Sequence, residues 1–120
     1  MMTQASWKGR GNKMEQKLTK YSISGDTIVV ELANELDHHN AVSIREEIDR
    51  HIYSGRIKNI VFDFKNTTFM DSSGIGVILG RHRILKNVGG IISVANINKS
   101  VDRLLTISGV YKIVEKSGQI

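Results

Sequence analysis

The spacing of apolar residues changes repeatedly along this 120-residue chain, and this alternation constrains its fold more than any other feature. Short runs rich in Ile, Val, Thr and aromatic residues alternate with longer segments in which apolar residues recur every three or four positions. Strand-like runs that alternate with helix-like segments are typical of α/β proteins. The chain length suits one domain with a core of its own.

The first half of the chain predicts a hairpin, a helix and a buried strand. Residues 17–32 are expected to form two strands around a turn at Gly25, where glycine eases the backbone geometry. A helix should follow an N-cap at Asp37 and end at Gly55. Its buried face is expected to comprise Ala41, Ile44, Ile48 and Ile52. The strand over residues 57–64 should be central, with one face formed by Ile60, Phe62 and Phe64.

The second half predicts two more helices and two more strands. One helix is indicated by a broad apolar face that Gly89-Gly90 closes, formed by Ile75, Ile78, Leu79, Leu85 and Val88. A second helix should be capped by Asn98 or Ser100. The remaining segments are a strand at residues 91–97, this second helix at residues 99–109 and a strand at residues 111–116. Since the hairpin is antiparallel and helical crossovers make neighbouring strands parallel, we expect an α/β fold with a mixed β-sheet packed with α-helices.

Composition narrows the classes of protein to consider. The chain has no Cys and no Pro, so it has neither a disulfide framework nor a thiolate metal site. It also has no apolar run of membrane-span length and no signal-peptide core, so we expect a soluble, cytoplasmic protein. The formal net charge is +5, but three basic residues lie in residues 1–13, which contain no acid. We expect this segment to be a flexible basic leader or tag, residues 14–120 to form the domain, and no direct nucleic-acid partner.

The segment Asp71-Ser72-Ser73-Gly74 is the part of the sequence that most suggests a function. It lies where a strand-like run ends and a helix begins, the edge at which α/β proteins usually build their sites. From spacing alone we favour a structural explanation, in which Ser72 or Ser73 caps the helix and the glycines allow close packing.

Three chemical alternatives remain for this segment. A serine hydrolase is disfavoured because the order is not Gly-x-Ser-x-Gly and because His82 lies roughly 15 Å further along the same helix. A phosphate-binding loop would need a Gly-Lys-Ser/Thr sequence, which is absent. An exposed serine at a helix N-terminus is, by contrast, a good acceptor for a regulatory phosphoryl group.

Two segments, ELDHHNA at residues 35–41 and FMDSSGIGVILGR at residues 69–81, resemble the signature segments of the STAS domain family. Within that family they are most similar to the sporulation anti-sigma F factor antagonists, from about Leu18 to Val114. The resemblance implies a protein that is not an enzyme and uses no cofactor. Such a protein binds an anti-sigma factor, itself a serine kinase that uses ATP, and thereby frees a sigma factor for transcription.

The same resemblance implies roles for individual residues. Phosphorylation of Ser72 would switch the antagonist off, and a metal-dependent serine phosphatase would restore it. Asn34 stands where the family often has glycine, and asparagine also tolerates left-handed backbone geometry. The alternative function is a STAS domain that senses a nucleotide or another small ligand. The implied partner-binding residues are Asp37, Asp71, Ser73, Gly74 and Gly76.

The remaining polar and glycine residues have plain explanations. His38-His39 comes with no third ligand, so we expect no metal site. Arg81 belongs to a basic stretch that we expect on an ordinary solvated face, although part of it could flank an acidic kinase surface and speed encounter. Gly76 and Gly80 share a helical face, and close helix–sheet packing explains them at least as well as partner contact does.

Overall fold

The computed structural model describes residues 18–118. The strands are β1 (Lys20–Ser24), β2 (Thr27–Glu31), β3 (Glu35–Leu36), β4 (Asn59–Asp63), β5 (Phe69–Met70), β6 (Ile92–Ala95) and β7 (Glu115–Gly118). The helices are α1 (His38–Tyr53), α2 (Ser72–Leu85) and α3 (Lys99–Ser108), with 3₁₀ helices η3 (Lys86–Val88) and η4 (Val110–Lys112). The leader or tag predicted for residues 1–13 lies outside the described residues.

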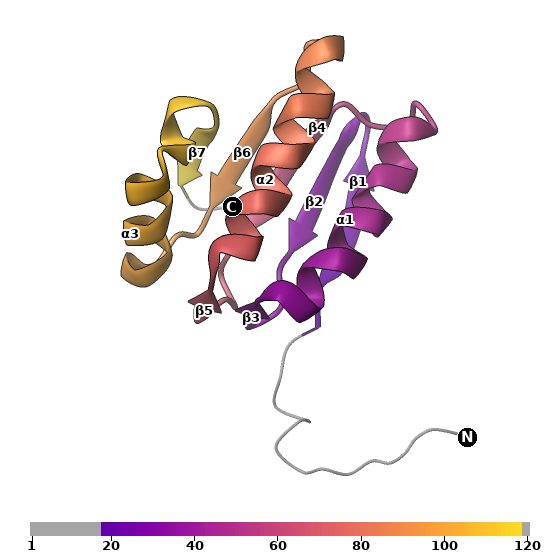
Figure 1. The fold of residues 1–120 in the computed structure, drawn as a ribbon. Coiled ribbons are helices and arrows are strands. Elements are labelled where there is room, and N and C mark those ends of the chain that lie inside the picture. The colour runs from indigo at the N-terminus through magenta and orange to yellow at the C-terminus, as the bar shows by residue number, and fades with distance from the viewer. Residues whose placement is uncertain (1–17, 119–120) are drawn as a thin grey trace, which may run out of the picture.

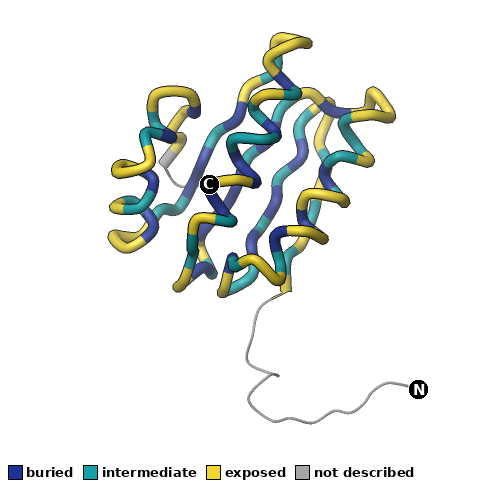
Figure 2. Tube along the Cα trace, in the orientation of Figure 1, coloured by how far each residue is buried: buried dark blue, intermediate teal, exposed yellow. Residues whose placement is uncertain are grey.

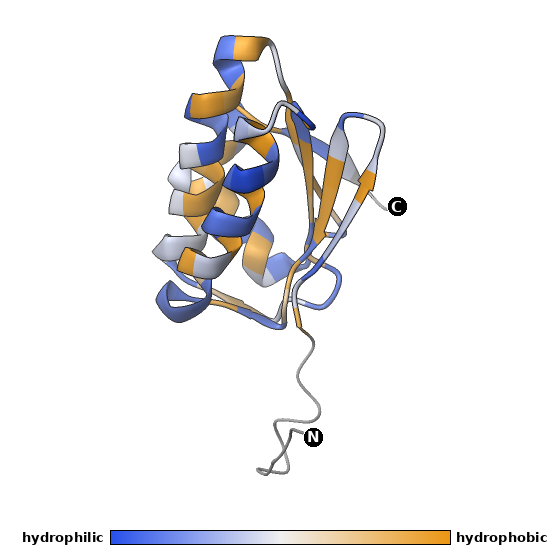
Figure 3. Cartoon of the chain, turned by 90° about the vertical axis from the view of Figure 1, so that its right-hand side faces the viewer, coloured by the Kyte–Doolittle hydropathy of each residue, from blue (hydrophilic) through white to orange (hydrophobic). Residues whose placement is uncertain are grey.

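The main sheet has five strands in the order β1-β2-β4-β6-β7 (Figure 1). The β1 and β2 strands pair antiparallel, and all the other neighbours in this sheet pair parallel. The three helical crossovers all step in the same direction across the sheet, and right-handed crossovers therefore place their helices on one face. Figure 3 shows the helices on one side of the sheet. The predicted α/β fold with a mixed sheet is confirmed.

The core lies between this sheet face and the helices. The strand register aligns two rows of buried side chains, Ile28-Ile60-Ile92 and Val30-Phe62-Val94. Figure 2 shows these buried positions alternating with more exposed ones along the central strands, as the pleat requires. Fully burying a side chain such as Phe62 contributes about 1.5–3 kcal/mol. From α1 the predicted residues Ala41, Ile44 and Ile48 complete this core.

Most predicted helix boundaries are confirmed, but the end of α2 is not. Gly55 has a φ of 79° just beyond α1, as expected of a helix stop. The α2 helix ends at Leu85 and tightens into η3, so Val88 is not part of its buried face and is 56% exposed. The tightening is a common way to end a helix before a left-handed residue, here Gly89 with a φ of 74°.

The last strand is also displaced from the predicted position. Residues Val110–Lys112 form η4, and β7 comprises Glu115–Gly118 rather than residues 111–116. The left-handed Gly109 ends α3 and the chain then turns once more, which buries Val110 in the core. An apolar, β-branched run can therefore be buried in a turn as well as in a strand, and the spacing alone does not distinguish the two.

Candidate functional site

Two very short strands, which the sequence analysis did not predict, bring the candidate residues together. The β3 and β5 strands pair in parallel, with Leu36 opposite Met70. Each strand runs directly into an aspartate, Asp37 or Asp71, that caps the next helix. The N-termini of α1 and α2 consequently lie near one another, at the edge of the domain reached by the carboxyl ends of β2 and β4 (Figure 1).

Backbone hydrogen bonds fix the two loops that precede these aspartates. The Asn34 carbonyl accepts from the N–H groups of Thr68 at 2.8 Å and Phe69 at 3.2 Å. The Asp71 N–H donates to the carbonyl of Leu36 at 3.2 Å. Asn34 does not have a positive φ, so the tolerance of asparagine for left-handed geometry is not used at this position. Its backbone carbonyl, rather than a special backbone conformation, holds the loops together.

A second anchor joins the loop before Ser72 to α3. The hydroxyl of the buried Thr67 donates to the carbonyl of Ala33 at 2.8 Å. The Thr67 carbonyl in turn accepts from Nδ2 of Asn98 at 2.6 Å. Asn98 also caps α3. Of the two caps that the sequence analysis left open, Asn98 and Ser100, the structure therefore has Asn98. The sequence predicted the cap but not its second bond, because that bond joins residues 31 positions apart.

Aspartate side chains cap both helices at the site. Oδ1 of Asp37 accepts from the Asn40 N–H at 3.0 Å, which confirms the predicted N-cap. Oδ1 of Asp71 accepts from the Ser73 N–H at 2.8 Å, so the expectation that Ser72 or Ser73 caps α2 is wrong. A carboxylate suits this position because it also interacts favourably with the positive end of the helix dipole.

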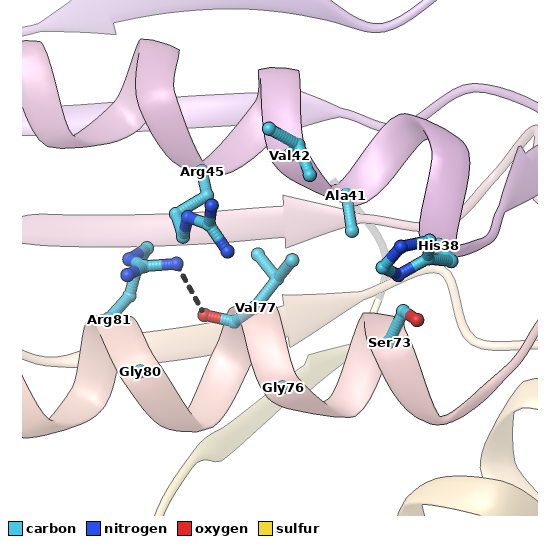
Figure 4. Close-up of a pocket in the computed structure, with 9 residues that line it drawn as sticks. All are labelled: His38, Ala41, Val42, Arg45, Ser73, Gly76, Val77, Gly80 and Arg81. Atoms are coloured by element: carbon cyan, nitrogen blue, oxygen red, sulfur yellow. Dashed lines mark hydrogen bonds between the residues drawn. The ribbon is translucent and has the colours of Figure 1, made fainter.

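The two adjacent serines have different surroundings. Ser72 is the first residue of α2 and is exposed. Ser73 is partly buried and its side chain lies toward α1, near His38 (Figure 4). The partial positive charge at a helix N-terminus favours a negatively charged group there. Ser72 is therefore the accessible hydroxyl of the pair, in a place that tolerates an added anion.

The three glycines of α2 serve different purposes. A Cβ on Gly74 would lie 2.6 Å from Cγ of Met70 and 2.9 Å from Cδ2 of Leu36. Gly74 is buried and faces the domain's own side chains, so its missing side chain serves internal packing. A Cβ on Gly76 or Gly80 would meet no atom within 4 Å. Helix–sheet packing, one of the two explanations considered for these latter glycines, does not apply.

Alanine substitutions at these glycines should change stability in opposite directions. Gly76→Ala and Gly80→Ala should each raise the free energy of unfolding by about 0.5–1 kcal/mol, because alanine loses less conformational entropy in a helix. Gly74→Ala should lower it by about 1–3 kcal/mol through overpacking against Met70. Urea denaturation measures all three changes. Equal losses at Gly74 and Gly80 would contradict this assignment.

The sequence analysis expected Arg81 on a solvated face, and this expectation is wrong. Its side chain is only 6% exposed, and its Nε lies 3.0 Å from Oδ1 of Asp49 on α1. Burial lowers the pKa of Arg81, the charge of Asp49 opposes that shift, and the charge of Arg45 adds to it. Arg83 and Lys86 are exposed, as expected. The apolar spacing of α2 could not predict the ion pair between Arg81 and Asp49, because Asp49 lies on another helix.

The other predicted side chains form no additional cluster. His38 and His39 are both exposed at the start of α1. Residues 18–118 contain no group of three or more His, Cys, Asp or Glu side chains that could hold a metal ion. Over the same range, the helices are too short or too polar to cross a membrane.

Phe69 is a candidate contact residue that the sequence analysis did not single out. It lies in β5, close to Asp71, and is 50% exposed. Exposed aromatic side chains next to a polar site are typical of energetically important contacts in interfaces. The sequence signal that could have identified Phe69 is an aromatic residue just before the Asp-Ser-Ser segment.

The fold and the paired helix N-termini are those of a STAS domain. The family model described as "STAS domain" matches residues 19–119, and the chain belongs to this family. The anti-sigma F factor antagonist of Paenibacillus polymyxa is 44% identical over 87 residues, which are 72% of this chain and 74% of that protein. The resemblance recognised from the two sequence segments is confirmed.

Two solved structures extend the similarity to three dimensions. The anti-sigma factor antagonist SpoIIAA in its unphosphorylated form has a TM-score of 0.70 and 30% identity, over 82% of this chain and 86% of that one. The Bacillus cell fate determinant SpoIIAA in its phosphorylated form has a TM-score of 0.70 and 32% identity, over 82% of this chain and 90% of that one. The fold is thus similar to that of an antagonist known in both states.

Proposed function

We propose that this protein is an anti-sigma factor antagonist that binds an anti-sigma factor serine kinase and thereby releases a sigma factor. The observation that carries the proposal is the exposed Ser72 at the capped N-terminus of α2, in a chain 44% identical to an anti-sigma F factor antagonist. In this function the protein is the substrate of the kinase rather than an enzyme. It acts in the cytoplasm, in transcription regulation of the sporulation type.

Phosphorylation of Ser72 switches the antagonist off, and a serine phosphatase restores it. Three features support this part of the proposal. The Ser72 hydroxyl is exposed, Asp71 rather than Ser72 caps the helix, and the dipole of α2 favours an anion at that position. SpoIIAA, which is similar to this chain, is known in a phosphorylated form.

The partner contact surface surrounds Ser72 on β5 and at the starts of both helices. Asp37, Asp71, Ser73 and Gly76 contribute to it, and Phe69 adds an exposed aromatic ring. Gly74 acts differently from what the resemblance implies, because it is buried against Met70 and supports the surface from inside.

The kinase step tests the function directly. The protein is incubated with ATP and the anti-sigma kinase of its own genome, and intact masses are measured for the wild type, Ser72→Ala and the neighbouring control Ser73→Ala. We expect one added phosphoryl group on the wild type and on Ser73→Ala, and none on Ser72→Ala.

Two other results would count against the proposal. An unmodified wild type, with a kinase that is active on a control substrate, would overturn the assignment of the kinase as partner. A phosphoryl group on Ser72→Ala but not on Ser73→Ala would move the switch to the partly buried serine.

A further inference from the structure

A groove of about 390 Å³ runs between α1 and α2, starting next to Ser72 (Figure 4). Ser73 and His38 line the end near the helix N-termini, and Arg45 and Arg81 line the other end. Gly76 and Gly80 form part of the wall contributed by α2. Because the groove begins at Ser73, a protein that covers the neighbouring Ser72 would also extend over the groove.

The two glycines of the wall have no internal explanation. Gly76 and Gly80 lie inside a helix, where glycine is less favourable than alanine. A Cβ at either position would meet open space, in contrast to Gly74, where it would collide with Met70. Their missing side chains keep the groove open, so a molecule outside the chain can approach the backbone of α2 closely.

The end of the groove away from Ser73 carries a buried guanidinium group, that of Arg81, whose hydrogen-bond donors are only partly used. The Arg81 side chain is 6% exposed, and its Nε is paired with Oδ1 of Asp49 at 3.0 Å. Its Nη1 donates only to the carbonyl of Val77, at 3.4 Å. A guanidinium has five N–H donors in a planar fork, so Arg81 retains donors for a further acceptor.

A second cation lies at the same end, and no acid lines the groove. Arg45 is exposed, lines the groove beside Arg81, and forms no ion pair with any described residue. The groove lining contributes two guanidinium groups and the imidazole of His38, but no carboxylate. Asp49 compensates one of the two guanidinium groups, so the pair keeps a net positive charge, and a bound carboxylate would neutralise that charge while accepting hydrogen bonds from Arg45 and Arg81.

We infer that this groove receives an acidic side chain of the anti-sigma factor, with Arg45 and Arg81 binding its carboxylate and Gly76 and Gly80 admitting the segment that carries it. The inference rests on the proposed function and adds the chemistry of the partner. It also connects the groove to the switch. A phosphate on Ser72, next to the Ser73 end of the groove, would repel an acidic segment that passes that end.

Affinity measurements with the purified anti-sigma factor test the groove. Arg45→Glu reverses an exposed charge and should weaken binding by about tenfold or more, since like charges are then placed together. The matched control is Arg83→Glu, an identical charge change at an exposed position of α2 outside the groove, which should bind like the wild type. The double variant Gly76→Ala, Gly80→Ala should also bind more weakly while melting at a higher temperature, so its defect would not be one of folding.

Each outcome supports or overturns a defined statement. If Arg45→Glu and the double glycine variant both bind with wild-type affinity, the inference that the groove binds an acidic side chain is overturned, while the proposed function stays intact. Equal losses of affinity for Arg45→Glu and Arg83→Glu would mean that overall charge, rather than binding in the groove, explains the effect. Failure of the wild type itself to bind the anti-sigma factor would reject the proposed function and, with it, this partner.

Discussion

Phosphorylated Ser72 should lower the affinity for the anti-sigma factor by about a hundredfold, which corresponds to about 2.7 kcal/mol. The phosphate brings about −1.5 to −2 charges at neutral pH. It would stand beside Asp71, under whatever partner surface covers the start of α2. Like charges brought together in an interface cost several kcal/mol, and burial against a partner removes the water that would otherwise screen them.

Isothermal titration of the anti-sigma factor with five proteins, including the unmodified wild type, measures this effect. Phosphorylated wild type should bind most weakly, and Ser72→Asp should show part of the loss because it carries a smaller charge. Ser72→Ala should retain wild-type affinity. The control is Ser24→Asp, which adds the same charge at an exposed serine beside the β1–β2 turn, at the opposite end of β2 from the site. Equal affinities of wild type and Ser72→Asp would argue strongly against an electrostatic switch at this residue.

The switch should leave the fold unchanged. Asp71 supplies the cap of α2, so a modified Ser72 removes no hydrogen bond that the helix needs at its start. The helix dipole would also favour the phosphate locally. The expected loss of affinity therefore arises at the interface, and the melting temperature of the phosphorylated protein should stay close to that of the unmodified one.

The sequence predicted the parts of this fold whose burial follows a regular period. The buried faces of α1 and β4 were predicted directly from apolar spacing, since a helix or strand of ordinary length shows several periods. The Asp37 cap could also be predicted, because it depends on residues only three positions apart.

The candidate site contains features that no local pattern could reveal. The β3 and β5 strands have two residues each, which is too short for a period, yet their pairing brings Asp37 and Asp71 into one region. The Arg81–Asp49 pair joins two helices, so a basic stretch that looks solvated from its own helix is partly buried. Such contacts depend on the assembled fold, and single-sequence spacing reports only the local part of it.

Gly90 illustrates the same limit at a single residue. The sequence analysis treated Gly89-Gly90 as one helix stop, but the two glycines are needed for different reasons. Gly89 has a φ of 74°, which suits glycine. A Cβ on Gly90 would instead lie 1.9 Å from the backbone carbonyl oxygen of Lys58, just before β4. Because that oxygen belongs to the backbone, it has no side-chain rotation with which to move away.

Gly90→Ala should therefore be among the most damaging single-methyl changes in this protein, lowering the free energy of unfolding by about 3 kcal/mol or more. To relieve the contact, the chain must shift where β6 begins beside β4, and this strains the nearby hydrogen bond from the Ile60 N–H to the Ile91 carbonyl, 3.0 Å long. Urea denaturation should be compared with Gly89→Ala, expected to cost about 1 kcal/mol through backbone strain alone. If Gly90→Ala is no less stable than Gly89→Ala, the close approach of Lys58 does not constrain this junction, and only Gly89, through its left-handed φ, requires glycine there.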